Sequence, residues 1–151
     1  KVPLYKDQVI IYLEDLAKSL NIESNEKLLT PTMLNSYVKQ RVIPAPKDKK
    51  YTEEHLAYLI VVGVLKQVFS LQEICELINI QIKGYSVEEA YDYFCDEIEK
   101  AIKAVFITRD FSYASMVDNN IKESKMLKSA VLSFAHKLYI TEYLKDETTN
   151  D

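Results

Sequence analysis

Glycine and proline are scarce in this sequence, which holds two glycines and four prolines among 151 residues. Because the turns of a many-stranded sheet rely on these residues, their scarcity disfavours an all-β fold and favours helices. A glycine-rich phosphate-binding loop is excluded for the same reason, since its backbone needs several glycines close together.

Cysteines and long apolar runs are also few. Cys75 and Cys95 form no Cys-x-x-Cys pair, so we interpret them as small buried apolar residues in a reducing cytoplasm. The longest apolar run, Leu56–Leu65, covers about half the length of a bilayer-spanning helix and predicts a buried helix at the centre of a domain. With no recognisable signal peptide, the sequence predicts a cytoplasmic protein without membrane segments.

Positive charge is concentrated near the start of the chain, although the net charge is −4. Residues 1–50 hold nine Lys/Arg against six Asp/Glu, which gives +3, while residues 51–151 hold ten against seventeen, which gives −7. Within Thr30–Lys50 five basic residues accompany one acidic residue, which gives +4. A basic patch on an acidic body is typical of a domain that binds an acidic partner.

Helical patterns cover most of the N-terminal half. Apolar residues at three- and four-residue steps predict a helix over Asp7–Leu20, followed by a polar connection over Asn21–Lys27. Thr30-Pro31 is a typical start for a second helix that ends near Arg41, because the prolines that follow disfavour helix. A short Pro/Lys-rich loop then leads into the apolar helix described above.

The C-terminal half is predicted to form long helices. Ser70 and Ser86 each begin a capping-box pattern, with a glutamate three residues later. Apolar residues recur at alternating four- and three-residue steps over Val87–Val105, and a last helix is expected over Lys122–Leu144. The apolar seam could join two copies of the chain, or it could pack on the last helix of the same chain.

The most specific pattern lies in Thr30–Ile78. A V-I-P turn at Val42–Pro44 follows the predicted second helix, Tyr51 ends the basic loop, and Val68–Ile74 has the sequence V-F-S-L-Q-E-I. The segment resembles the MerR family of transcription regulators, in which the recognition helix ends in such a turn and a short wing follows. Leu29–Phe69 also resembles the YkrK-type family, uncharacterised bacterial proteins that form a domain of unknown function.

Together the helical patterns and the resemblance predict an all-α fold. A MerR-like winged helix-turn-helix would occupy residues 1–80, and a C-terminal helical region, bundle or coiled-coil-like, would occupy residues 86–146. The resemblance implies a transcription regulator that binds duplex DNA, and since two-fold DNA sites need two-fold proteins, we expect a homodimer. Arg41 departs from the family pattern, which has glycine there, so a left-handed backbone would cost about 1 kcal/mol.

One face of the predicted second helix and the basic loop hold the candidate DNA-binding residues. Short polar side chains beside a lysine suit base edges and phosphates, an asparagine can read adenine, and loop lysines suit phosphates. Asn35 and Ser36 stand where MerR proteins usually have Arg and Tyr. The candidates are Thr32, Asn35, Ser36, Lys39, Arg41, Lys47, Lys49 and Lys50.

Enzymatic chemistry has little support in the sequence. His55 and His136 have no cysteine or carboxylate at metal-ligand spacing, and the acidic residues of Glu88–Glu99 spread around their helix like a solvated surface. We therefore expect no catalytic residue, metal or cofactor. Two other classes stay open: a protein-interaction adaptor that keeps the fold without binding DNA, and a sensor with an apolar pocket between the last two helices, whose small-molecule effector is unknown.

Overall fold

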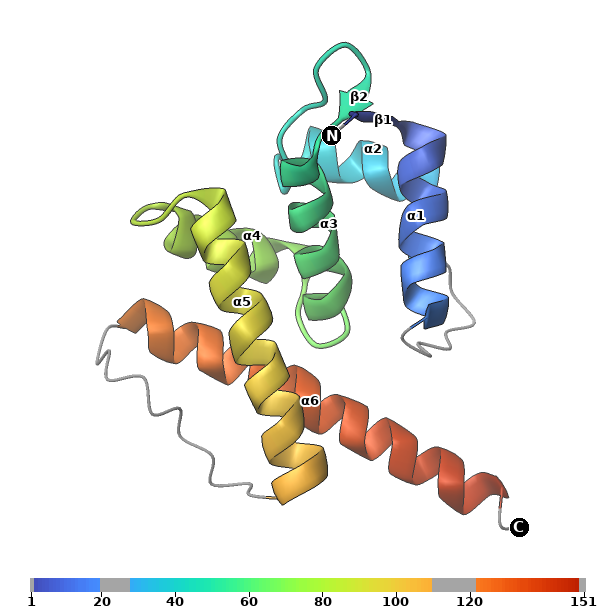
Figure 1. Cartoon of the computed structure of the whole chain (residues 1–151), viewed down its shortest axis with the longest axis vertical. Coiled ribbons are helices and arrows are strands. Elements are labelled where there is room, and N and C mark those ends of the chain that lie inside the picture. The colour runs from blue at the N-terminus through green and yellow to red at the C-terminus, as the bar shows by residue number, and fades with distance from the viewer. Residues whose placement is uncertain (1, 20–27, 110–121, 150–151) are drawn as a thin grey trace. The chain divides into compact units, whose positions relative to one another are not determined.

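The protein is described here by a computed structural model that covers residues 2–19, 28–109 and 122–149 (Figure 1). It is mostly helical, which confirms the predicted all-α class, and its β-structure within the described residues is limited to two short strands. The chain forms two compact units, Lys1–Val64 and Leu65–Asp151. None of the described helices is both long and apolar enough to cross a bilayer. The domain limits of 1–80 and 86–146 stay a prediction.

The N-terminal unit is built from α1 (Lys6–Ser19), α2 (Pro31–Lys39) and most of α3 (Glu53–Leu65). α1 and α2 each bury an apolar stripe, as the periodicity of the sequence predicts, whereas α3 is apolar on all sides. The predicted connection over residues 21–27 lies outside the described residues. The buried core includes Val9, Leu13, Leu34, Tyr37, Leu59 and Val62.

Both ends of α2 are fixed by capping interactions. The Thr30 hydroxyl accepts a hydrogen bond from the backbone N–H of Met33 at 3.1 Å, and proline occupies the first turn. At the other end the N–H of Val42 donates to the carbonyl of Tyr37 at 2.9 Å, which closes a Schellman motif. Arg41 lies in this motif with φ 59°, the left-handed backbone anticipated from the sequence.

A two-residue antiparallel ladder joins the start of the chain to the basic loop. Strand β1 (Leu4–Tyr5) pairs with β2 (Lys50–Tyr51), with Leu4 opposite Tyr51 and Tyr5 opposite Lys50. Because α1 begins at the residue that follows β1, this pairing places the first turn of α1 beside the loop. The periodicity of the sequence did not predict β1.

The C-terminal unit contains α4 (Leu71–Ile82), α5 (Val87–Ile102), the π-helical segment η1 (Lys103–Thr108) and α6 (Lys122–Thr149). Both predicted capping boxes are present, at the N-termini of α4 and α5. The predicted last helix begins at residue 122 as expected and extends five residues beyond the predicted end.

The apolar seam of α5 and η1 packs on α6 within the same chain, and Figure 1 shows the two helices crossing. The side chains buried there include Phe94, Ala101 and Val105 from α5 and η1, and Leu127, Val131 and Phe134 from α6. Of the two roles that the sequence left open for this seam, packing within the chain is thus observed.

One acidic residue and the two cysteines differ from expectation. The predicted solvated surface holds for most of Glu88–Glu99, but it is wrong for Glu97, whose side chain is fully buried. Glu97 follows Phe94 by three residues and precedes Ala101 by four, so it lies on the apolar face of α5. Both cysteines are half-buried rather than fully buried, and burial raises the pKa of the Cys95 thiol.

Candidate nucleic-acid interface

Three elements of the N-terminal unit meet around one cavity of about 690 Å³. Lys6 comes from the first turn of α1, Asn35 and Lys39 come from α2, and Lys49 comes from the basic loop. Asp7 is the acidic residue among those that line it. The fold therefore gathers three lysines from distant parts of the sequence around one cavity.

The basic loop has the geometry of a tight hairpin. Lys47 and Lys50 exchange two backbone hydrogen bonds, of 3.2 Å and 2.9 Å, across a two-residue turn. The two turn residues, Asp48 and Lys49, both have positive φ, at 51° and 62°. This is the conformation of a type I′ turn, which matches the twist of the flanking strands and favours Asn or Asp followed by Gly. Lys49 therefore stands where glycine would carry less strain.

Asn35 is held by Lys6, a residue outside the predicted set of DNA-binding residues. The ammonium of Lys6 donates a hydrogen bond to Oδ1 of Asn35 at 2.6 Å. Since lysine can only donate, this contact settles the orientation of the amide: its oxygen faces Lys6, and its NH₂ group remains able to donate. Lys6 thus restricts the rotamers of Asn35 and occupies one of the two acceptor positions on its oxygen.

The remaining candidates do not line the cavity: they are Thr32, Ser36, Arg41, Lys47 and Lys50. Ser36 is half-buried, and its hydroxyl accepts a hydrogen bond from Gln40 Nε2 at 2.7 Å. The ammonium of Lys50 lies over the ring of Tyr5, 5.3 Å from its centroid. Thr32, Arg41 and Lys47 are exposed. The structure therefore brings together Asn35, Lys39 and Lys49 from the predicted set.

His55 links the start of α3 to the basic loop through hydrogen bonds. Its Nδ1 accepts a hydrogen bond from the backbone N–H of Thr52 at 3.0 Å, so the ring proton resides on Nε2, which donates to the carbonyl of Ala45 at 3.2 Å. The ring also meets Tyr51 edge-on, with centroids 5.3 Å apart. His55 thereby takes the place of glutamate in a capping box at the start of α3 and joins that helix to the loop.

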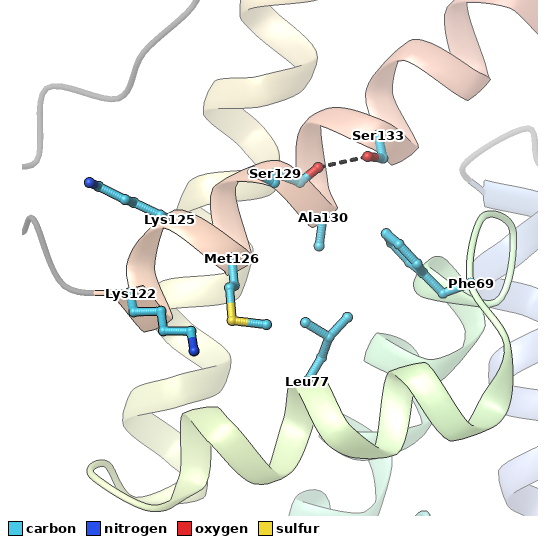
Figure 2. Close-up of a pocket in the computed structure, with 8 residues that line it drawn as sticks. All are labelled: Phe69, Leu77, Lys122, Lys125, Met126, Ser129, Ala130 and Ser133. Atoms are coloured by element: carbon cyan, nitrogen blue, oxygen red, sulfur yellow. Dashed lines mark hydrogen bonds between the residues drawn. The ribbon is translucent and has the colours of Figure 1, made fainter.

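A second cavity, of about 560 Å³, lies in the C-terminal unit (Figure 2). Leu77 of α4 faces Met126 and Ala130 of α6 across it, while the side chain of Lys125 extends away. This cavity lies between α4 and α6, whereas the sequence predicted a sensor pocket between the last two helices, where a cavity of about 730 Å³ is lined by residues of α5 and α6 together with the end of α4. In the residues that the structure describes, no three His, Cys, Asp or Glu side chains gather as a metal site requires.

Comparison with known proteins gives a family for the chain and no activity. No curated protein and no solved structure matches it. A family model described as "Domain of unknown function (DUF1836)" matches residues 1–94, which include the whole cavity with its three lysines. The expectation of an uncharacterised domain family is therefore confirmed: this chain belongs to the DUF1836 family.

Proposed function

We propose that this protein is a cytoplasmic, non-enzymatic transcription regulator that binds duplex DNA through a MerR-like winged helix-turn-helix. The observation that carries the proposal is the convergence of Lys6, Lys39 and Lys49 with Asn35 around one cavity on the N-terminal unit. Phosphate contacts by lysine dominate the affinity of proteins for DNA, and polar side chains on a helix supply the base contacts.

In this arrangement α2 is the helix that enters the major groove. Its buried side, with Leu34 and Tyr37, packs into the core, while Asn35 and Lys39 are exposed on the opposite side. The hairpin at Lys47–Lys50 is the wing, and it lies against the phosphate backbone next to the groove. Lys6 has two roles, since it supplies a positive charge and holds the Asn35 amide.

Charge distribution supports the same surface. Residues 1–50 carry a net charge of +3 and the acidic residues outnumber the basic ones beyond residue 50, so DNA is attracted to the first 50 residues and repelled by the rest of the chain. Backbone strain is compatible with the same surface: Lys49 lines the cavity at a left-handed turn position that glycine would adopt more easily.

Binding to a fluorescent random-sequence duplex, measured by anisotropy over a range of salt concentrations, tests the proposal. Lys39→Met and Lys49→Met should each weaken binding to all sequences and lower the log–log salt slope by about 0.9 for each phosphate that is no longer neutralised. Lys18→Met is a matched control, because this exposed lysine lies in the last turn of α1, about 18 Å along the helix from Lys6. It should bind like the wild type.

Wild-type protein that shows no salt-dependent binding to any duplex at low ionic strength would contradict the proposal. In that case the adaptor, which keeps the fold without binding DNA, becomes the first choice.

A sensor function is the second candidate, and the cavity between α4 and α6 favours it. Phe69, Leu77, Met126 and Ala130 give this cavity an apolar floor that suits an apolar small molecule (Figure 2). Ala130→Trp should fill the space and abolish any ligand-induced rise in melting temperature, as measured by thermal-shift screening. If no apolar compound raises the melting temperature of the wild type, this second candidate is wrong.

A further inference from the structure

The C-terminal half of α6 carries an exposed apolar stripe. Ile140, Tyr143 and Leu144 are 55%, 57% and 58% exposed, whereas the first half of the same helix buries Leu127 and Val131. Ile140 and Leu144 lie four residues apart and therefore share one face of the helix, and Tyr143 flanks them. Large apolar side chains grouped on one exposed helix face are typical of an interaction surface.

Two opposite charges border this stripe. Lys137 precedes Ile140 by three residues, and Glu147 follows Leu144 by three, so all four lie on one face at coiled-coil spacing. Both charged side chains are exposed, and within the described residues no ion pair involves either of them. By contrast, Lys145 and Glu142, which lie outside this row, pair with each other at 3.4 Å.

We propose that this face of α6 binds the same face of a second copy of the chain in antiparallel orientation. The four positions are symmetric about Glu142: Ile140 and Leu144 are equally far from it, and so are Lys137 and Glu147. A two-fold axis at Glu142 therefore sets Ile140 against Leu144 of the second copy and Lys137 against Glu147. A parallel pair would instead set lysine against lysine and glutamate against glutamate, which repel each other.

This surface is distinct from the Val87–Val105 seam, which packs within the chain. It is small, with three large apolar side chains from each copy, and is therefore below the size of a standard stable interface. We expect a reversible dimer with a dissociation constant on the order of 100 μM in free solution. The proposal does not rest on DNA binding, although such a dimer would present two copies of the N-terminal unit.

Sedimentation equilibrium of the full chain, from roughly 10 μM to roughly 500 μM, tests the pairing. Lys137→Glu and Glu147→Lys should each weaken the dimer roughly ten-fold at low salt, because each change replaces two attractive pairs with two repulsive ones. The double variant, and an equimolar mixture of the two single variants, should both return to wild-type association. In a parallel dimer neither single change would weaken association.

A matched pair of apolar variants tests the surface itself. Leu144→Asp should abolish dimerisation, whereas Ile11→Asp, which changes an equally exposed residue on α1, should leave it unchanged. Circular dichroism of each variant confirms that it is folded. A wild-type protein that stays monomeric at every concentration, or one whose dimer resists Leu144→Asp, would overturn the proposal and assign the stripe to another partner.

Discussion

Replacing Glu97 by methionine should stabilise the C-terminal unit. The Glu97 side chain is fully buried on the apolar face of α5, and neither of its carboxylate oxygens has a hydrogen-bond partner. The nearest cation is the ammonium of Lys100, 3.9 Å from Oε1, which also lies 2.8 Å from Asp96 and has 42% side-chain exposure. Methionine has a similar length and needs no hydrogen bond, so it suits the same space.

The expected gain in the free energy of unfolding follows from the contacts of Glu97. A buried polar group without a partner costs about 1–3 kcal/mol, and removing a charge from water costs several kcal/mol. Attraction between the charges of Lys100 and Glu97 at this distance would stabilise the fold by about 4 kcal/mol at an effective dielectric constant near 20. Because Lys100 is exposed to solvent, the actual attraction is considerably weaker. We therefore expect Glu97→Met to raise the free energy of unfolding by about 1–3 kcal/mol.

Thermal unfolding followed by circular dichroism measures this effect. For a unit of this size each 1 kcal/mol corresponds to a rise of about 4–8 °C in Tm. Glu99→Met is the matched control on the same helix: its side chain is 65% exposed, and we expect a change within about 0.5 kcal/mol. Glu97→Met that lowers stability, with Glu97→Gln neutral, would show that the buried site favours a polar side chain and would refute the reasoning.

Three further predictions concern other parts of the chain. Lys49→Gly should raise the free energy of unfolding of the N-terminal unit by about 1 kcal/mol, measured by urea unfolding, because glycine adopts the left-handed backbone without strain. The same change should weaken duplex binding. A lower free energy of unfolding would contradict this prediction. Asn35→Ala should lower the ratio of specific to random-duplex binding, because an asparagine that reads adenine is lost, and Lys6→Met should lower the same ratio by releasing the Asn35 amide; a ratio unchanged in Lys6→Met would exclude a positioning role for Lys6. Hydrogen bonds from Ser86 lower the pKa of Glu89 below its ordinary 4.5, so their stabilisation is present above that pH and is lost as pH falls through the lowered value. Ser86→Ala removes only the hydroxyl, the smaller of the two causes, and keeps the backbone N–H donor, so stability should fall somewhat less steeply in acid than for the wild type. Glu89→Gln removes the titrating group and should reduce this acid dependence further; an acid dependence of stability in Glu89→Gln as steep as that of the wild type would contradict this.

The sequence predicted those features of the fold that depend on neighbouring residues. Capping boxes at Ser70 and Ser86, and the Thr30-Pro31 helix start, arise from contacts within four residues, so their sequence pattern determines them. Helix periodicity likewise gave α1 and α6 to within a few residues. The predicted ends were less accurate, because a helix such as α6 can continue past its apolar stripe.

Features that depend on contacts between distant residues were missed. Lys6 reaches Asn35 across 29 positions, and the packing of α1 on α2 together with the pairing of β1 with β2 brings its helix turn to that place. Strands of two residues leave no periodic signal in a sequence. Glu97 was misjudged for the same reason, since a run of acidic residues around a helix does not reveal which of them faces a neighbouring helix.

The positive-φ residues connect stability with the proposed function. Arg41, Asp48 and Lys49 all lie between α2 and α3, and all adopt a left-handed backbone that glycine would adopt more easily. Aspartate tolerates this conformation better than most residues, and at Arg41 this conformation closes the Schellman motif that ends α2, whereas Lys49 lies in a turn position that favours glycine. Because Lys49 lines the cavity, its charge is a reason for this strain that a purely structural hairpin would not have. A chain that needed only the fold would be more stable with glycine there, so the proposed DNA contact would give a reason for the lysine at this position.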